Sequence, residues 1–273
     1  MKNILIPTDF SFCARNAIQY AIDCFGHKEV QYYFLNTYEQ VSSSATMMVS
    51  LIDRMREDSV NGLKNEVDYF QNILPNTAKP IISLTEYGAL RNVLSKKVVD
   101  NNIDFVVVGT KGADGFDKFI TGSNASDLIR AVNCPLIIVP ENHRFIKIRT
   151  IGFAADFERI MNHSVSNSID SFLQDFDSQL VVVNIRKEGE ELDLEKGAAR
   201  VNLHSLFKGK RFMVSNIENK NIVEGINNFG KDYDIDLLVM LARKHGFFES
   251  IFRKSITKEI AMMGELPLII INE

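Results

Sequence analysis

Short apolar runs recur along the first half of the chain, and a segment with helical spacing follows most of them. The runs cover residues 2–6, 30–35, 81–84, 105–108 and 136–139. Their residues do not alternate between apolar and polar, which favours strands buried on both faces, as in a parallel sheet. We therefore expect five strands in this half.

Between these runs, apolar residues recur every three or four positions, which predicts helices. The first helix is expected to begin after Ser11, a good N-cap residue, and to end at Phe25 before Gly26. Further helices are expected over residues 47–74, 90–99 and 123–132. Alternating strands and helices predict a doubly wound, Rossmann-like α/β domain with an open five-stranded, mainly parallel sheet flanked by helices.

The second half of the chain repeats the first. Residues 3–25 match residues 150–172 at a constant offset of 147, so that Asp9 aligns with Asp156. Residues 102–141 match residues 234–273 at a constant offset of 132. Two matches in the same order predict two tandem domains of one fold.

The boundary between the two copies should fall within the segment ENHRFIKIR, residues 141–149. This segment lies after the last strand-like run of the first copy and before the first run of the second. We expect the domains to cover residues 1–143 and 148–273.

Two turns are candidates for chemistry because both follow strands of the first copy. Ligands of doubly wound sheets bind outside the carboxyl ends of the strands, where the strand order reverses. IPTDFS follows the first strand, and VGTKG begins a loop with the spacing G-x2-G-x9-G-S at Gly109, Gly112, Gly122 and Ser123. Glycines allow the backbone to approach an anion closely, and a helix that starts at Ser123 would present unpaired N–H groups.

With this loop spacing, PTDFS near the start and CPLIIVP at the end, residues 1–140 resemble a nucleotide-binding universal stress protein domain. Both halves together resemble a tandem universal stress protein. The resemblance implies a stress-response protein whose first domain binds ATP, AMP or another adenine nucleotide. It assigns the phosphates to the glycine loop and the adenosine to the turn with Asp9, whose carboxylate can accept hydrogen bonds from ribose hydroxyls. The residues it maps to the site are Pro7, Thr8, Asp9, Asn36, Val108, Gly109, Gly112, Gly122, Ser123, Asn124 and Ala125.

Simpler interpretations of these residues stay open at this point. Asp9 could cap the helix that begins near Ser11, with or without a ligand role. The glycines could serve only as turn residues, and Lys111 could pair with a phosphate or lie in solvent.

The second copy has lost most of the loop motif. At the offset of 132, the three glycines are replaced, and only the serine keeps its type; the equivalent residues are Leu241, Lys244, Lys254 and Ser255. Side chains add bulk where the backbone would have to approach a phosphate. Pro7 and Thr8 have also become Ala154 and Ala155. We expect a degenerate second domain that completes an intramolecular pseudo-dimer through the final strands, as the family commonly pairs, with a homodimer as a further possibility.

Composition narrows the partners and the compartment. The net charge of −4, from 31 basic and 35 acidic residues, gives no basic stripe for nucleic acid. No run approaches the ~18 apolar residues of a membrane span. Three cysteines without a CxxC pair, together with a start unlike a signal peptide, predict a cytoplasmic protein.

An enzyme is the weaker expectation. Asp114 and Asp117 lie in the glycine loop and could hold Mg²⁺ beside ATP, although acidic residues are common in such loops. The chain has no GxxxxGK[ST] motif, and its five histidines show no metal-ligand spacing. We expect no catalytic residue and no protein metal site, and we expect a nucleotide-responsive binding module. The alternatives are a slow ATPase and a scaffold that binds no nucleotide.

Overall fold

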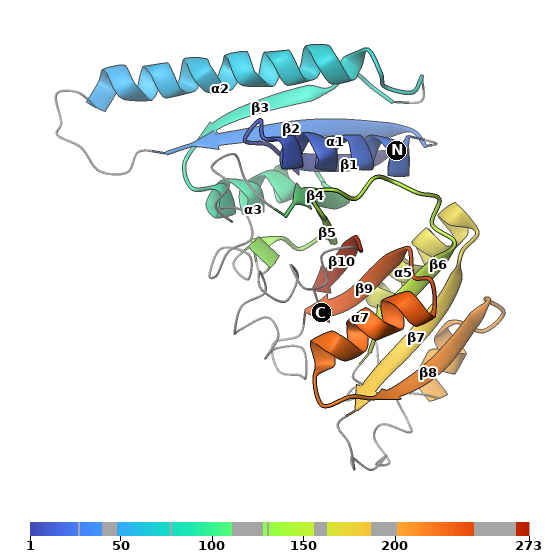
Figure 1. The fold of residues 1–273 in the computed structure, drawn as a ribbon. Helices are drawn as coiled ribbons and strands as arrows, with labels where there is room; N and C mark the ends of the chain where they lie inside the picture. Colours follow the sequence, from blue (N-terminus) through green and yellow to red (C-terminus); the bar gives the residue numbers. More distant parts are fainter. Residues whose placement is uncertain are drawn as a thin grey trace. The chain divides into compact units, whose positions relative to one another are not determined.

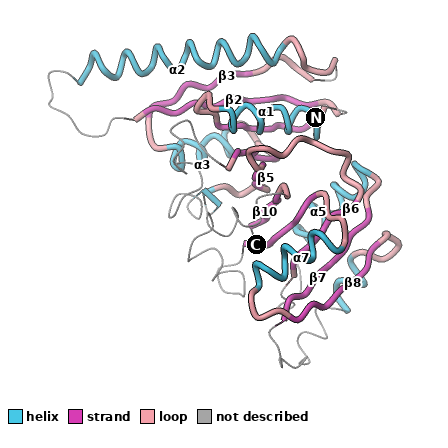
Figure 2. Tube along the Cα trace, in the orientation of Figure 1, coloured by secondary structure: helices cyan, strands magenta, loops and turns pink. Residues whose placement is uncertain are grey.

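The computed structural model describes residues 1–26, 28–39, 48–76, 78–110, 128–129, 131–155, 163–186, 201–242 and 266–272. These residues belong to two compact units, Met1–Phe145 and Ile146–Glu273. The division lies inside the segment 141–149. In both units, strands and helices alternate along the trace (Figure 2).

The first unit begins with a buried strand and continues as a series of strand and helix pairs (Figure 1). Its described elements are β1 (Lys2–Pro7), α1 (Phe12–Phe25), β2 (Val30–Tyr38), α2 (Met48–Gln71), β3 (Ile82–Tyr87), α3 (Leu90–Asp100), β4 (Phe105–Gly109) and β5 (Leu136–Val139). The helix predicted over residues 123–132 falls mostly outside the described residues. Leu128 and Ile129 are helical and buried.

The strand order of this unit is β3-β2-β1-β4-β5, and the described neighbours all run parallel. The chain moves from β1 through β2 to β3 on one side and then returns to β4 and β5 on the other. The order therefore reverses between β1 and β4, which is the switch point where ligands of such sheets bind. The predicted doubly wound α/β fold is confirmed.

Two polar contacts of β3 show that helices cover both faces of the sheet. Ser59 of α2 lies 3.5 Å from Thr85, oxygen to oxygen, whereas Lys97 of α3 forms an ion pair with Glu86. Neighbouring residues of a strand point to opposite faces, so α2 and α3 lie on opposite sides. Helix α1 shares the α2 side, because Arg15 of α1 contacts Glu66 of α2.

The carboxyl edge of this sheet is stepped. The last pair between β1 and β2 is Pro7 with Leu35, yet β2 continues for three more residues, paired only with β3, to Tyr38. At ~3.3 Å a residue, the ends of β2 and β3 rise about 10 Å above the end of β1. The sequence predicted this strand only to Leu35, because the polar residues Asn36 and Thr37 interrupt its apolar pattern.

The second unit repeats this order. Its described elements are β6 (Thr150–Ala154), α5 (His163–Phe176), β7 (Gln179–Arg186), β8 (Phe212–Glu218), α7 (Ile222–Asp232), β9 (Leu237–Ala242) and β10 (Leu268–Asn272). The order is β10-β9-β6-β7-β8, again parallel, with β6 in the place of β1. In the described ranges, no helix has the length and the apolar character that crossing a membrane requires.

The two units also share a hydrogen bond at the start of their first strands. The Asn3 amide donates to Asp104 Oδ2 at 2.7 Å, and the Thr150 amide donates to Asp236 Oδ2 at 2.9 Å. Asp104 and Asp236 are equivalent at the offset of 132, and Asn3 and Thr150 at the offset of 147. The sequence repeat therefore corresponds to a repeated structure.

Candidate functional site

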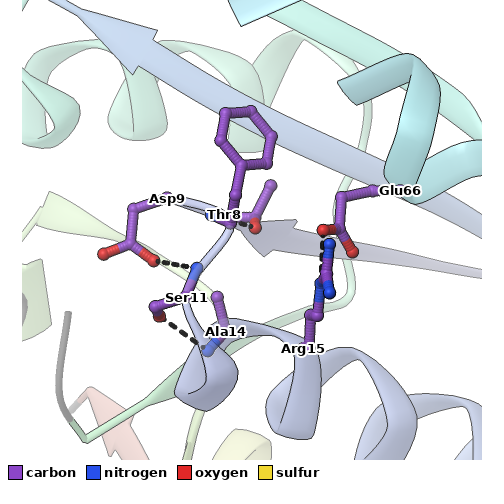
Figure 3. A network of polar contacts seen from close by, with 7 residues as sticks. Thr8, Asp9, Ser11, Ala14, Arg15 and Glu66 are labelled. Carbon is purple, nitrogen blue, oxygen red and sulfur yellow. Dashed lines mark hydrogen bonds and ion pairs between the residues drawn. The ribbon is translucent and has the colours of Figure 1, made fainter. Parts of the chain in front are cut away.

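The turn after β1 is held by its own side chains (Figure 3). Thr8 Oγ1 accepts a hydrogen bond from the Phe10 amide at 3.0 Å, and Asp9 Oδ1 accepts one from the Ser11 amide at 3.1 Å. Ser11 Oγ then accepts from the Ala14 amide at 3.1 Å, which confirms Ser11 as the N-cap of α1. Asp9 therefore closes the turn, and Ser11 caps the helix.

The position of Asp9 remains compatible with a ligand role. Its side chain is half-buried and points away from the Arg15 and Glu66 pair on the other side of the turn (Figure 3). Thr8 is 2% exposed, so its side chain belongs to the interior of the turn. A ligand above this edge would meet the Asp9 carboxylate rather than the Thr8 hydroxyl.

Asn36 fixes the turn to β2. Its Nδ2 donates to the Thr8 carbonyl at 2.7 Å, beside the backbone bond from the Thr8 amide to the Leu35 carbonyl at 2.8 Å. The second unit repeats the side-chain bond, since Asn184 Nδ2 donates to the Ala155 carbonyl at 3.0 Å. An interaction common to both units is structural. The amide of Asn36 is thus committed to the fold, and only its remaining surface could line a site.

Gly109 lies at the end of β4, where the first turn of α1 crosses it. A Cβ at this position would lie 2.6 Å from the carbonyl oxygen of Cys13 and 2.9 Å from its carbonyl carbon. A glycine is therefore required here by the close approach of two backbone segments. The neighbouring Val108 has a side chain that is 1% exposed and belongs to the core.

The structure thus brings Pro7, Thr8, Asp9, Asn36 and Gly109 together at the switch point. Most of the predicted loop lies outside the described residues, namely Lys111, Gly112, Asp114, Asp117, Gly122, Ser123, Asn124 and Ala125. The same holds in the second unit for Asp156, Lys244, Lys254 and Ser255. Leu241, the counterpart of Gly109, is described and is 4% exposed.

A contact that the sequence did not predict ties this turn to α2. Phe10 has a φ of 66°, a left-handed conformation rare for an aromatic residue, and its ring packs on Gly62, where a Cβ would lie 2.4 Å away. Arg15 Nε lies 2.6 Å from Glu66 Oε1, and the Glu66 side chain is 1% exposed. Glu66 Oε2 has no hydrogen-bond partner. These contacts join residues far apart in the chain. The one local signal for them is Gly62, a glycine in the middle of the helix expected over residues 47–74.

The described residues offer little for covalent or metal chemistry. All three cysteines, Cys13, Cys24 and Cys134, are buried, and none of them forms a disulfide. Burial, followed by the nearby Asp104 charge, raises the pKa of the Cys134 thiol to about 12, so this thiol stays protonated at neutral pH. Among these residues, no group of three or more His, Cys, Asp or Glu side chains could hold a metal ion. The described part of the edge does offer hydrogen-bonding groups and the N-terminus of α1.

Comparison with known sequences identifies one family for the first unit. The family model described as universal stress protein family matches residues 1–140. A putative universal stress protein of Staphylococcus aureus is 23% identical over 159 residues, which are 58% of this chain and 89% of the relative.

Comparison with solved structures extends the likeness of fold to the whole chain. The crystal structure of a universal stress protein from Archaeoglobus fulgidus aligns with a TM-score of 0.72 at 15% identity, over 99% of this chain and 96% of its own. A putative universal stress protein from Pseudomonas aeruginosa aligns with a TM-score of 0.58 at 11% identity, over 100% of this chain and 93% of its own. At these identities the likeness concerns the fold alone.

Proposed function

The chain belongs to the universal stress protein family, and we propose that its first unit binds an adenine nucleotide, ATP above all, as a nucleotide-responsive module in a cytoplasmic stress response. The observation that carries the proposal is the position of Gly109. It begins the G-x2-G-x9-G-S spacing and lies at the end of β4, at the switch point beside the Asp9 turn. A switch point is where nucleotides bind in doubly wound sheets.

The chemistry of the edge fits an anionic ligand that also carries hydroxyl groups. The glycine loop would hold the phosphates through backbone N–H groups and the helix that follows it. The half-buried Asp9 carboxylate would accept hydrogen bonds from the ribose hydroxyls. If ATP brings Mg²⁺, Asp114 and Asp117 are the acidic residues of the loop that could share it. The three buried cysteines, none of which forms a disulfide, suit a reducing compartment such as the cytoplasm.

We propose further that the second unit does not bind a nucleotide. Leu241 replaces Gly109 there and is buried, and Ala154, which ends β6, and Ala155, which follows it, replace Pro7 and Thr8. The hydrogen bonds of the fold, such as that of Asn184, persist. The second unit has therefore kept this hydrogen bond of the fold and the acid at Asp156, and has lost the three glycines of the loop motif.

A pair of loop variants tests this proposal. Gly122→Lys installs the residue that the second copy has at the equivalent position, and it should abolish ATP binding in isothermal titration calorimetry. Gly115→Lys places the same side chain in the same loop but outside the motif spacing, and it should bind ATP within about threefold of the parent. Equal binding by the parent and Gly122→Lys would overturn the proposal.

Hydrolysis is a separate question for the same samples. A binding module releases phosphate no faster than ATP decays without protein, whereas a slow ATPase releases it in proportion to protein concentration. If neither ATP nor AMP binds the intact chain, the result favours the scaffold alternative.

A further inference from the structure

Phe10 has a strained backbone in the middle of the Asp9 turn. Its φ of 66° is left-handed, a conformation that is unfavourable for a residue with a Cβ and persists only where the surroundings enforce it. Two hydrogen bonds flank it: the Phe10 amide donates to Thr8 Oγ1 at 3.0 Å, and the Ser11 amide donates to Asp9 Oδ1 at 3.1 Å. The backbone of Phe10 therefore sets where the Asp9 carboxylate lies.

The side chain of Phe10 is held by α2, a helix that comes much later in the chain. Gly62 lies so close to the ring that a Cβ there would be 2.4 Å from two of its carbon atoms. Any other residue would push the ring away, although glycine weakens the interior of a helix. The contact with the Asp9 turn therefore explains a glycine that the helix itself does not favour.

An ion pair one helical turn further along α2 fixes the two helices beside this contact. Gly62 and Glu66 are four residues apart, so they share a face of α2. Arg15 Nε of α1 lies 2.6 Å from Glu66 Oε1, and the Glu66 side chain is 1% exposed (Figure 3). Separation of the pair would leave a carboxylate buried without its cation, which is strongly unfavourable. The Asp9 turn, the start of α1 and the middle of α2 therefore form one packed unit.

We infer that the contact of Phe10 with Gly62 couples α2 to the nucleotide site, so that docked α2 positions the Asp9 carboxylate and a bound nucleotide stabilises the docking of α2. This inference rests on the proposed nucleotide site and adds its regulation. Coupling is reciprocal, so the factor by which docked α2 strengthens binding at Asp9 is the factor by which the ligand favours docked α2. Phe10 and Gly62 are positioning residues, because they act on the ligand through Asp9.

The coupling gives occupancy of the site an effect at the surface. The buried residues of α2 lie along one face, namely Ser59, Leu63, Glu66 and Phe70. Most of the residues between them are exposed. A change in how firmly α2 docks therefore changes a helical surface that a partner can contact, which is what a nucleotide-responsive module requires.

Isothermal titration of Gly62→Ala with ATP tests the coupling. The added Cβ displaces the Phe10 ring and with it the Asp9 carboxylate, and loss of hydrogen bonds to a charged group should weaken ATP binding about tenfold. In a Phe10→Gly background no ring meets the Cβ, and glycine adopts the left-handed φ freely. There the same change should alter the affinity by less than about twofold.

Phe70→Leu provides a matched control on the same helix. Phe70 packs edge-to-face on Phe34 of β2, with ring centroids 5.8 Å apart, and lies two helical turns or about 12 Å along α2 from Gly62. Both substitutions lower the free energy of unfolding, so a general loss of stability would weaken ATP binding in both. We expect Phe70→Leu to bind ATP within about twofold of the parent.

Substitution of Arg15 tests the coupling without any change at Phe10 or Gly62. Arg15→Met leaves the buried Glu66 charge without its cation, which loosens α2 from α1. It should weaken ATP binding in the same direction as Gly62→Ala. Arg15→Lys keeps the positive charge and should weaken ATP binding less than Arg15→Met does.

Hydrogen exchange measures the reciprocal effect of the ligand on α2. Saturating ATP should slow amide exchange in the C-terminal half of α2 by a larger factor than in α3, which lies on the opposite face of the sheet. In Phe10→Gly, the two factors should be equal.

The outcomes separate this inference from the proposed function. ATP binding that Gly62→Ala and Arg15→Met leave unchanged overturns the coupling and leaves the nucleotide site standing. Equal weakening by Gly62→Ala and Phe70→Leu also overturns the coupling, as does exchange that ATP slows equally in α2 and α3 of the parent. Absence of ATP binding to the parent overturns the nucleotide site and the coupling together.

Discussion

Substitution of Gly109 by alanine tests how closely α1 approaches the end of β4. The added Cβ would lie 2.6 Å from the Cys13 carbonyl oxygen and 2.9 Å from the carbonyl carbon. Both atoms are backbone, so no side chain can rotate away, and the first turn of α1 must move by several tenths of an ångström. Overpacking of this kind typically costs about 1–3 kcal/mol.

The sign of the change in the free energy of unfolding shows whether the close contact between α1 and β4 exists. Gly109 has no left-handed φ, so alanine fits its backbone, and without the contact Gly109→Ala would stabilise the protein by about 0.4–1 kcal/mol through the unfolded chain. Urea unfolding followed by circular dichroism, with the transition of the first unit analysed separately, measures the difference. A free energy of unfolding equal to or above that of the parent would refute the close approach.

Three further predictions concern stability. Gly62→Ala should lower the free energy of unfolding by about 1–3 kcal/mol, because the added Cβ would lie 2.4 Å from the Phe10 ring. In a Phe10→Gly background the same change should raise it by about 1 kcal/mol through helix propensity. If urea unfolding gives a change of the same sign in both backgrounds, the contact is contradicted. Arg15→Met should cost about 2 kcal/mol, less than for a fully buried pair because Arg15 is 55% exposed. Glu66→Met, which removes the buried charge itself, should cost less, and the reverse order in thermal unfolding would refute this reasoning. Burial raises the pKa of Cys134 from 9.0 to about 12, so the thiol ionises in the unfolded chain at a lower pH than in the folded protein. The contribution of the buried thiol to stability is therefore lost as the pH rises above about 9. The difference in free energy of unfolding between the parent and Cys134→Ala should narrow over that range, and a constant difference would contradict the burial.

The sequence predicted the order of the elements well, because buried parallel strands and amphipathic helices leave strong local patterns. Ser11 was predicted as an N-cap and accepts the expected hydrogen bond. Gly26 ends α1 as predicted, but its backbone is right-handed, with a φ of −63°. The glycine is needed instead for space, since a Cβ would lie 2.5 Å from the Ile22 carbonyl oxygen and 2.7 Å from Pro75 Cγ.

The candidate site was predicted in part. The two turns at the carboxyl edge could be found because each follows an apolar run and contains residues of a recognisable motif. The contact of Phe10 with Gly62 and the buried Glu66 could not be found, because they depend on how two helices meet in space. The continuation of β2 to Tyr38 was missed because the end of that strand is polar.

The central claim is that the chain has a nucleotide site in its first unit and none in its second. The most direct test is the stoichiometry of ATP binding to the intact chain, measured by isothermal titration calorimetry at a protein concentration well above the dissociation constant. We predict one ATP per chain. Two ATP molecules per chain, or none, would contradict the claim.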